Sequence, residues 1–253
     1  MLKILLNGCN GKMGQVLADE IKAQENMEAV AGVDRHPDKI TNTFPVYEDI
    51  FKCKEKVDII IDFSNPYYLT GLLDYALEKN IGVVIATTGF TNQDLENIKT
   101  ASKKIPVFFS ANMSLGINVL NSLVKKATKV LHESFDIEII EKHHKHKLDS
   151  PSGTAYMIAK EINEELNNSK EYVFGRYGTK EKRRDEEIGI HSIRGGSIVG
   201  EHSVIYAGDD EVLEVKHIAS SKKIFAAGSI KAAKFLYKKE PGFYNMDDLI
   251  NLN

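Results

Sequence analysis

The chain has 253 residues, of which 42% are hydrophobic and 27% are charged, and its formal net charge is -3. This composition supports a packed core in one large domain or two smaller ones, and it gives no general attraction for nucleic acid. No apolar run approaches the roughly 20 residues that span a bilayer. The two cysteines, Cys9 and Cys53, lack metal or redox spacing. We therefore expect a cytoplasmic protein that binds neither membrane nor nucleic acid.

The first part of the chain has the pattern of a dinucleotide-binding unit. Residues 2–6 form an apolar run typical of a buried parallel strand, and the turn G-C-N-G-K-M-G over 8–14 follows. An amphipathic helix begins near Gln15, and a second strand over 28–33 ends at Asp34. The spacing predicts a pyrophosphate site, although the glycines run G-x-x-G-x-x-G instead of G-x-G-x-x-G. The alternative is a tight strand-to-helix turn in another kind of α/β protein.

Asp34 and Arg35 suit different forms of the cofactor. A carboxylate at the end of the second strand can accept hydrogen bonds from the ribose hydroxyls of NADH. An adjacent arginine can pair with the 2′-phosphate of NADPH. Both residues are present, so we expect use of NADH, NADPH or both; the alternative for Arg35 is an ordinary solvent-facing position.

Strands and helices continue to alternate up to about residue 113. This alternation predicts a doubly wound parallel sheet, in which ligands bind at the carboxyl ends of the strands. We therefore expect the turns at Gly8, Asp34, Thr87 and Ser110 to converge on one crevice. The predicted strands cover 57–62, 82–86 and 106–109, and the predicted helices cover 67–79 and 91–104.

The second half changes to longer strands with fewer helices. The pattern predicts an α+β layer with a mixed or antiparallel sheet, which could carry subunit contacts. The predicted dinucleotide-binding domain is 1–113 with 223–253, and the predicted substrate-binding and oligomerisation domain is 114–222. The predicted elements are helices over 115–131, 153–166 and 224–236, strands over 135–141, 188–194, 198–207 and 212–219, and a polar loop over 167–187.

A basic cluster follows the first of these strands. All six residues from Lys142 to Lys147 are lysine or histidine, and the turn D-S-P-S-G-T comes directly afterwards. Histidine changes charge near neutral pH, so such a cluster suits an anionic substrate that must be both held and protonated. Exposed amides at the helix start and the Thr154 hydroxyl would suit a carboxylate. The alternative is a solvated basic turn.

A metal site is a further alternative for this cluster. His143, His144 and His146 could supply ligands, but the H-E-x-x-H spacing is absent. The neighbouring lysines would also repel a divalent ion. We therefore predict no metal.

Several specific motifs occur in order along the chain. The most specific is E-I-I-E-K-H-H-K-H-K-L-D-S-P-S-G-T-A from Glu138. The others are G-C-N-G-K-M-G at Gly8, A-T-T-G-F at Ala86, S-A-N-M-S-L-G-I-N at Ser110, R-G-G-S-I-V-G-E-H at Arg194 and the ending F-A-A-G-S-I-K-A-A-K-F-L. With these motifs the chain resembles the 4-hydroxy-tetrahydrodipicolinate reductase (dihydrodipicolinate reductase) family of bacterial lysine biosynthesis, and the resemblance covers nearly the whole chain.

The resemblance implies a Rossmann-like first domain, a mixed-sheet second domain and a homotetramer built through that sheet. It implies NAD(P)H-dependent reduction of a cyclic unsaturated imine with two carboxylates in the diaminopimelate route. Hydride would reach a ring carbon conjugated with the imine, and the neighbouring carbon would then be protonated. His143 matches the proton donor and Lys147 a second donor that also contacts substrate; His144, Gly153 and Thr154 match substrate-carboxylate contacts. The matching cofactor contacts are Gly8, Cys9, Asn10, Gly11, Lys12, Met13, Asp34, Arg35, Ala86, Thr87, Thr88, Ser110, Ala111, Asn112 and Met113.

Three positions depart from the usual family pattern. Ala86 replaces a frequent glycine, Met113 a frequent aromatic residue, and Lys222 a frequent arginine. Lysine is the poorer partner for a planar bidentate contact, so Lys222 predicts looser cofactor binding.

Two other functions fit parts of the sequence. One is a different two-domain nicotinamide reductase that acts on an amino-acid precursor. The other is a non-catalytic redox sensor that binds NAD(H), but it would need a recognition module or basic face and would leave the His/Lys cluster without a role.

Overall fold

The computed structural model describes residues 1–179 and 181–250 and divides into two compact units. Unit 1 consists of Met1–Leu115 and Lys222–Asn253, and unit 2 is Gly116–Ser221. The predicted first domain extends to residue 253, and its last three residues lie outside the described residues.

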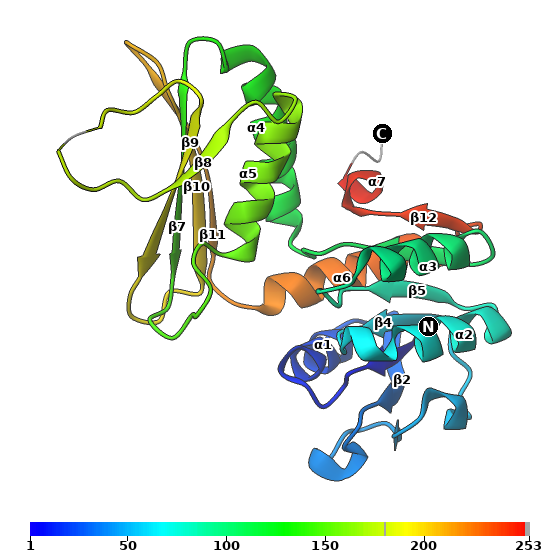
Figure 1. Cartoon of the computed structure of the whole chain (residues 1–253). Helices are drawn as coiled ribbons and strands as arrows, with labels where there is room; N and C mark the ends of the chain where they lie inside the picture. The colour runs from blue at the N-terminus through cyan, green and yellow to red at the C-terminus, as the bar shows by residue number, and fades with distance from the viewer. Residues whose placement is uncertain (180, 251–253) are drawn as a thin grey trace. The chain divides into compact units, whose positions relative to one another are not determined.

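Unit 1 is built on a seven-stranded sheet in which every strand pair is parallel (Figure 1). The strand order is β12-β6-β5-β4-β1-β2-β3, so the direction of winding reverses between β1 and β4. Ligands bind at such a switch point in doubly wound sheets. The strands are β1 (Leu2–Asn7), β2 (Met27–Val33), β3 (Val46–Tyr47), β4 (Ile59–Asp62), β5 (Gly82–Ile85), β6 (Pro106–Phe109) and β12 (Gly242–Tyr244).

Helices cover both faces of this sheet. Buried residues of α1 and α6 share one core cluster with Ile4, Leu6 and Ile61, whereas α2 and α3 share a second cluster with Leu5 and Ile60. Alternate residues of one strand thus enter opposite cores, which explains why the strands are almost continuously apolar. The helices are α1 (Lys12–Lys22), α2 (Leu69–Lys79), α3 (Asn92–Ser102), α6 (Lys223–Leu236) and α7 (Met246–Ile250), with 3-10 turns at Pro37–Lys39, Ile50–Lys52 and Pro66–Tyr68.

Unit 2 is a mixed five-stranded sheet with order β11-β10-β7-β9-β8. The pairs that include β10 are antiparallel, and β7 and β8 both pair with β9 in parallel. Helices α4 and α5 pack on one face around a core that includes Ile139, Ile158 and Val204. The elements are α4 (Leu115–Leu131), β7 (Asp136–His143), α5 (Gly153–Glu165), β8 (Glu171–Phe174), β9 (Glu187–Arg194), β10 (Gly200–Ala207) and β11 (Val212–Ala219).

The predicted fold class, a parallel doubly wound sheet plus a mixed-sheet layer, is confirmed. The prediction of a continuous loop over 167–187 is wrong, because β8 lies within it. Its four residues are too few to show a clear alternation, and it forms by pairing with β9. Strand β7 continues beyond the predicted end at residue 141 to His143, which places the start of the basic cluster on the sheet.

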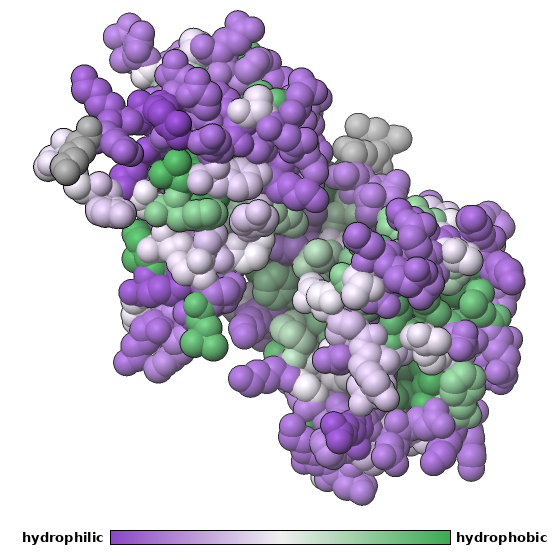
Figure 2. All heavy atoms as spheres, in the orientation of Figure 1, coloured by the Kyte–Doolittle hydropathy of each residue, from purple (hydrophilic) through white to green (hydrophobic). Residues whose placement is uncertain are grey.

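No described helix combines the length and apolar character required to cross a membrane. The face of the molecule in Figure 2 is mostly hydrophilic, with smaller apolar areas on both units.

Candidate active site

The glycine turn of unit 1 brings the ends of two strands close together. Gly8 has φ +82°, and a Cβ placed on it would lie 2.6 Å from the carbonyl oxygen of Phe63. A Cβ on Gly14 would lie 2.2 Å from the oxygen of Gly8, so glycine at position 14 allows α1 to pack against the turn. The N-cap residue Gly11 provides no side-chain cap for α1, which leaves the helix start suited to an anion.

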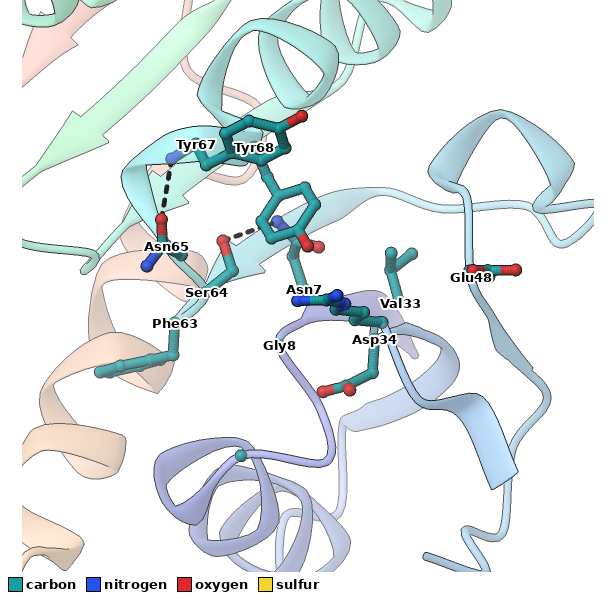
Figure 3. Close-up of a pocket in the computed structure, with 12 residues that line it drawn as sticks. Asn7, Gly8, Val33, Asp34, Glu48, Phe63, Ser64, Asn65, Tyr67 and Tyr68 are labelled. Atoms are coloured by element: carbon teal, nitrogen blue, oxygen red, sulfur yellow. Dashed lines mark hydrogen bonds between the residues drawn. The ribbon is translucent and has the colours of Figure 1, made fainter. Parts of the chain in front are cut away.

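A cavity of about 820 Å³ opens beside this turn, at the switch point between β1 and β4. Figure 3 shows Asp34 and Glu48 on one side of it and Tyr67 and Tyr68 on another. The residues that line it are Asn7, Gly8, Gly11, Val33, Asp34, Arg35, Glu48, Phe63, Ser64, Asn65, Tyr67 and Tyr68.

Asp34 lies at the carboxyl end of β2 and is held by the backbone. Its carboxylate accepts hydrogen bonds from the amides of Asn10 (3.0 Å) and His36 (3.0 Å). The Asn10 side chain in turn donates to the carbonyl oxygen of His36 at 2.7 Å. The carboxylate that the sequence predicted for ribose is therefore oriented before any ligand binds.

Asp62 joins the carboxyl ends of β1 and β4 and was not among the predicted site residues. It is buried at the end of β4 and accepts hydrogen bonds from Asn7 Nδ2 (2.7 Å) and from the Ser64 hydroxyl (2.5 Å). Burial raises the pKa of Asp62, while hydrogen bonds from Ser64 and Asn7 oppose that rise. This carboxylate therefore connects the end of β1 with the loop after β4 through neutral donors.

The structure brings only some of the predicted cofactor residues onto the cavity: Gly8, Gly11, Asp34 and Arg35. Cys9, Asn10, Ala86, Thr87, Asn112 and Met113 are buried, Met13 is partly buried, and Lys12, Thr88 and Ala111 are exposed. Ser110 stabilises its own turn by donating to the Asn112 carbonyl oxygen at 2.8 Å. The loops at Thr87 and Ser110 follow parallel strands as predicted, but they do not line this cavity.

In unit 2 the basic cluster straddles the end of β7. Lys142 and His143 are the last strand residues and point to opposite faces; Lys142 pairs with Glu201 at 3.3 Å, and His143 is buried. A turn follows, in which the amide of Lys147 donates to the His144 carbonyl oxygen at 3.1 Å. The side chains of the cluster therefore do not all face one ligand: Lys142 and His143 lie on opposite faces of β7, and the remaining residues lie in the turn.

Glu141 is the centre of a buried charged network beside His143. Its oxygens accept hydrogen bonds from Arg194 Nη1 (2.8 Å) and Nη2 (2.6 Å), from the amide of Ser152 (3.1 Å) and from His143 Nδ1 (2.6 Å). Burial by itself raises the pKa of Glu141, but Arg194, His143 and Ser192 outweigh it and lower the pKa to about 2. Glu141 is therefore a carboxylate at neutral pH.

A second histidine, His202, packs against His143. Its ring contacts that of His143 edge to face, with centroids 5.3 Å apart, and its Nε2 lies 2.9 Å from the Ser152 hydroxyl. Burial first, and then the proximity of the His143 ring, lowers the pKa of His202 to about 4. His202 is consequently neutral at physiological pH, and Ser152 connects it to the first turn of α5.

Lys147 lies near the start of α5. Its Nζ pairs with Asp149 Oδ1 at 2.8 Å, and the Lys147 hydrogen bond lowers the pKa of Asp149. Helix α5 begins at Gly153, whose absent Cβ would meet no atom within 4 Å. Thr154 follows in the same turn. Charged and polar groups that suit a carboxylate therefore gather at this helix start.

Within 1–179 and 181–250, no group of three or more histidine, cysteine, aspartate or glutamate side chains could hold a metal ion. The three clustered histidines do not form such a group.

The chain matches the two models of one protein family. Residues 2–113 match "Dihydrodipicolinate reductase, N-terminus", and residues 116–250 match "Dihydrodipicolinate reductase, C-terminus". The 4-hydroxy-tetrahydrodipicolinate reductase of Caldanaerobacter subterraneus subsp. tengcongensis is 53% identical over 99% of this chain and 98% of that protein. The one from Clostridium tetani is 49% identical over the same shares.

Two solved structures have folds similar to that of this chain. A dipicolinate-bound dihydrodipicolinate reductase from Paenisporosarcina sp. TG-14 aligns with a TM-score of 0.82 at 26% identity, covering 97% of both chains. GenD2 from gentamicin A biosynthesis, in complex with NAD, aligns with a TM-score of 0.63 at 10% identity, covering 98% of this chain and 90% of that one. The second likeness concerns the fold alone.

The parallel-sheet unit and these relatives define a nicotinamide-dependent oxidoreductase. The chain belongs to the dihydrodipicolinate reductase family. The prediction of a 4-hydroxy-tetrahydrodipicolinate reductase of the diaminopimelate route to lysine is thereby confirmed. Family membership decides against both the other reductase and the redox sensor.

Sequence reasoning missed the roles of Glu141, Arg194, His202 and Asp62 in these networks. A signal for Glu141 was present, because it shares the inward-facing alternate positions of β7 with Ile137, Ile139 and His143. A carboxylate on such a face needs a cation or several donors. Which cation fills that role is set by the pairing of β7 with β9.

Proposed function

We propose that His143 delivers the proton in the reduction of 4-hydroxy-tetrahydrodipicolinate and that Lys147 binds substrate and acts as a second donor. The observation that carries this proposal is the position of His143, next to the ionised Glu141 and tied through Ser152 to the start of α5. One end of unit 2 thus combines a titratable ring with groups that suit carboxylates. His144, Gly153 and Thr154 complete the proposed contacts with the substrate carboxylates.

Lys147 would exchange one carboxylate for another when substrate binds. Its present partner, Asp149, is largely exposed, with 57% of its side chain accessible. An ion pair with one exposed member contributes little stability, so a substrate carboxylate can displace Asp149 at small cost. Hydride addition to one ring carbon would shift an electron pair to the neighbouring carbon. His143 would release its proton to that neighbouring carbon and would regain a proton from solvent.

For the cofactor, we propose that unit 1 accepts both NADH and NADPH. The cavity at the switch point, the close glycine turn and the uncapped start of α1 fit a dinucleotide pyrophosphate. Asp34 would accept bonds from a ribose, and Arg35 would pair with a 2′-phosphate. When bound, the nicotinamide supplies the hydride.

The other proposed cofactor residues support that site from the turn and from the neighbouring loops. Cys9, Asn10, Lys12 and Met13 extend the turn around Gly8 and Gly11. Ala86, Thr87, Thr88, Ser110, Ala111, Asn112 and Met113 lie on the loops that follow β5 and β6.

A homotetramer formed through the sheet of unit 2 is part of this proposal. Helices α4 and α5 pack on one face, and strand alternation and register place Ile193, Ile205 and Ile218 on the other. Ile193 and Ile218 are 46% and 57% exposed. An open face with repeated apolar side chains favours self-association, and sedimentation equilibrium would measure it.

A coupled assay tests the reaction directly. The substrate would be generated in situ by a synthase that condenses pyruvate with aspartate semialdehyde. Nicotinamide absorbance would be followed with NADH and NADPH in separate runs. We expect substrate-dependent oxidation of both cofactors. Folded protein that binds a cofactor but oxidises neither would contradict the proposed reaction, and activity with only one would contradict dual use.

A further inference from the structure

Glu141 makes more contacts than a structural ion pair with Arg194 would require. It is fully buried, and it contacts three groups from three segments: His143 on its own strand, Arg194 on β9 and the amide of Ser152 before α5. The carboxylate therefore joins the ring of His143 to the helix start that carries Gly153 and Thr154. A change at Glu141 would affect both at once.

Arg194 keeps this carboxylate charged and oriented. Its two terminal nitrogens donate to the two oxygens of Glu141, in the bidentate arrangement that fixes a carboxylate in a plane. Nη2 also donates to the Asp149 carbonyl oxygen at 2.6 Å, which ties the guanidinium to the loop before α5. The arginine and the glutamate together carry no net charge, so the buried pair does not itself demand a proton from the ring.

The geometry distinguishes the two nitrogens of His143. An ionised carboxylate can only accept, so the 2.6 Å contact with Glu141 requires that Nδ1 carry a hydrogen. Nε2 lies on the other side of the ring, next to Gly200, where a Cβ would approach it to 3.1 Å. Glycine at position 200 thus leaves space beside Nε2 that a side chain would reduce.

We propose that Glu141, held by Arg194, is the positioning residue of the reaction: it fixes His143 with hydrogen on Nδ1 and leaves Nε2 as the nitrogen that exchanges the proton. This inference rests on the proposed role of His143. In the step, the Nε2–H bond of the protonated ring breaks and the proton goes to the substrate carbon. The Nδ1–H bond is retained, and the ring returns to its neutral form.

The tautomer can be read directly in the full-length protein. Long-range ¹H–¹⁵N NMR spectra of histidine-labelled protein separate the two ring nitrogens, and the signals lost in His143→Gln identify those of His143. In the neutral form of the His143 ring, we expect hydrogen on Nδ1 alone. A ring with hydrogen on Nε2, or an even mixture of tautomers, would overturn the proposal, and this result does not depend on whether any Glu141 variant folds.

Kinetics of Glu141→Gln supply the second test. The uncharged amide can present either an oxygen or an NH₂ group to the ring, so we expect mixed tautomers and a fall in kcat on the order of 10²-fold, with KM for NADH unchanged. Glu141→Asp, which keeps the charge but shortens the reach, should recover part of the loss. A purely structural role would instead lower thermal stability without changing the tautomer signals or kcat of the folded fraction.

Glu201→Gln is the matched control. Glu201 is also a glutamate of the unit 2 sheet, but it pairs with Lys142 and Lys216 outside this network, and the variant should leave both tautomer and kcat unchanged. The test of His143 as the proton donor is separate from the test of Glu141 as the positioning residue. If His143→Gln turns over normally, the proton-donor role fails, and the wild-type spectrum still decides whether Glu141 fixes the ring.

Discussion

The two units each bury a carboxylate near their functional end, and the two carboxylates have opposite electrostatic surroundings. Asp62 in unit 1 is surrounded by neutral donors, and burial raises its pKa. Glu141 in unit 2 is equally buried but faces Arg194, and its pKa falls to about 2 despite burial. The first arrangement holds loops around a binding cavity, whereas the second maintains a negative charge beside a titratable ring. Under the proposed function, the cofactor binds to unit 1 and the proton is transferred in unit 2.

Acid should weaken the Glu141 network. The pKa of Glu141 is 4.5 when unperturbed and about 2 in the folded protein, so the network adds stability above pH 4.5 and loses it as pH falls toward 2. A shift of this size corresponds to about 3 kcal/mol. Urea unfolding at pH 7, 5, 4 and 3 would measure it. Glu141→Gln should flatten this dependence, and an equal slope in both proteins would contradict it.

Gly14→Ala should damage unit 1 without altering unit 2. The added Cβ would meet the carbonyl oxygens of Gly8 and Cys9 at 2.2 Å and 2.6 Å. Relieving such a clash costs about 3 kcal/mol, so NADH binding measured by calorimetry should weaken about 100-fold. Gly71→Ala in α2 is the control, because its Cβ would meet nothing within 4 Å. Equal NADH affinity in both variants would show that the turn does not bind cofactor.

Lys147→Ala should weaken substrate binding more than cofactor binding. Removing a charged partner of a carboxylate costs about 1.5–3 kcal/mol, which corresponds to a rise in substrate KM of roughly 10- to 100-fold. We also expect kcat to fall, because a proton source is lost. The exposed neighbour Lys145 supplies the control variant Lys145→Ala. Steady-state kinetics that show an unchanged KM would argue against the binding role.

Arg35→Ala should change the cofactor preference by a smaller amount. The side chain is exposed beside the cavity, so loss of a 2′-phosphate contact should reduce kcat/KM for NADPH by about tenfold and leave NADH almost unaffected. Lys39→Ala, at another exposed position that does not line the cavity, tests for a general charge effect. Equal losses with both cofactors would refute the 2′-phosphate role.

Local patterns predicted the parts of both sites that depend on neighbouring residues. The glycine turn, Asp34 and the alternation of β7 follow from spacings of a few residues. The partners of the two buried carboxylates do not, because Glu141 pairs with Arg194 across 53 positions and Asp62 with Asn7 across 55. Strand register brings these residues together. The short strands β3, β8 and β12 were missed for the same reason, since pairing and not periodicity defines them.

The most direct test of the division between the units combines two measurements on His143→Gln. Calorimetry would give its affinity for NADH, and the coupled assay would give kcat at saturating substrate. We expect NADH affinity equal to that of the wild-type protein and kcat reduced on the order of 10²–10⁴-fold. Near-normal turnover, or a loss of cofactor binding that matches the loss of turnover, would contradict the assignment of proton transfer to unit 2.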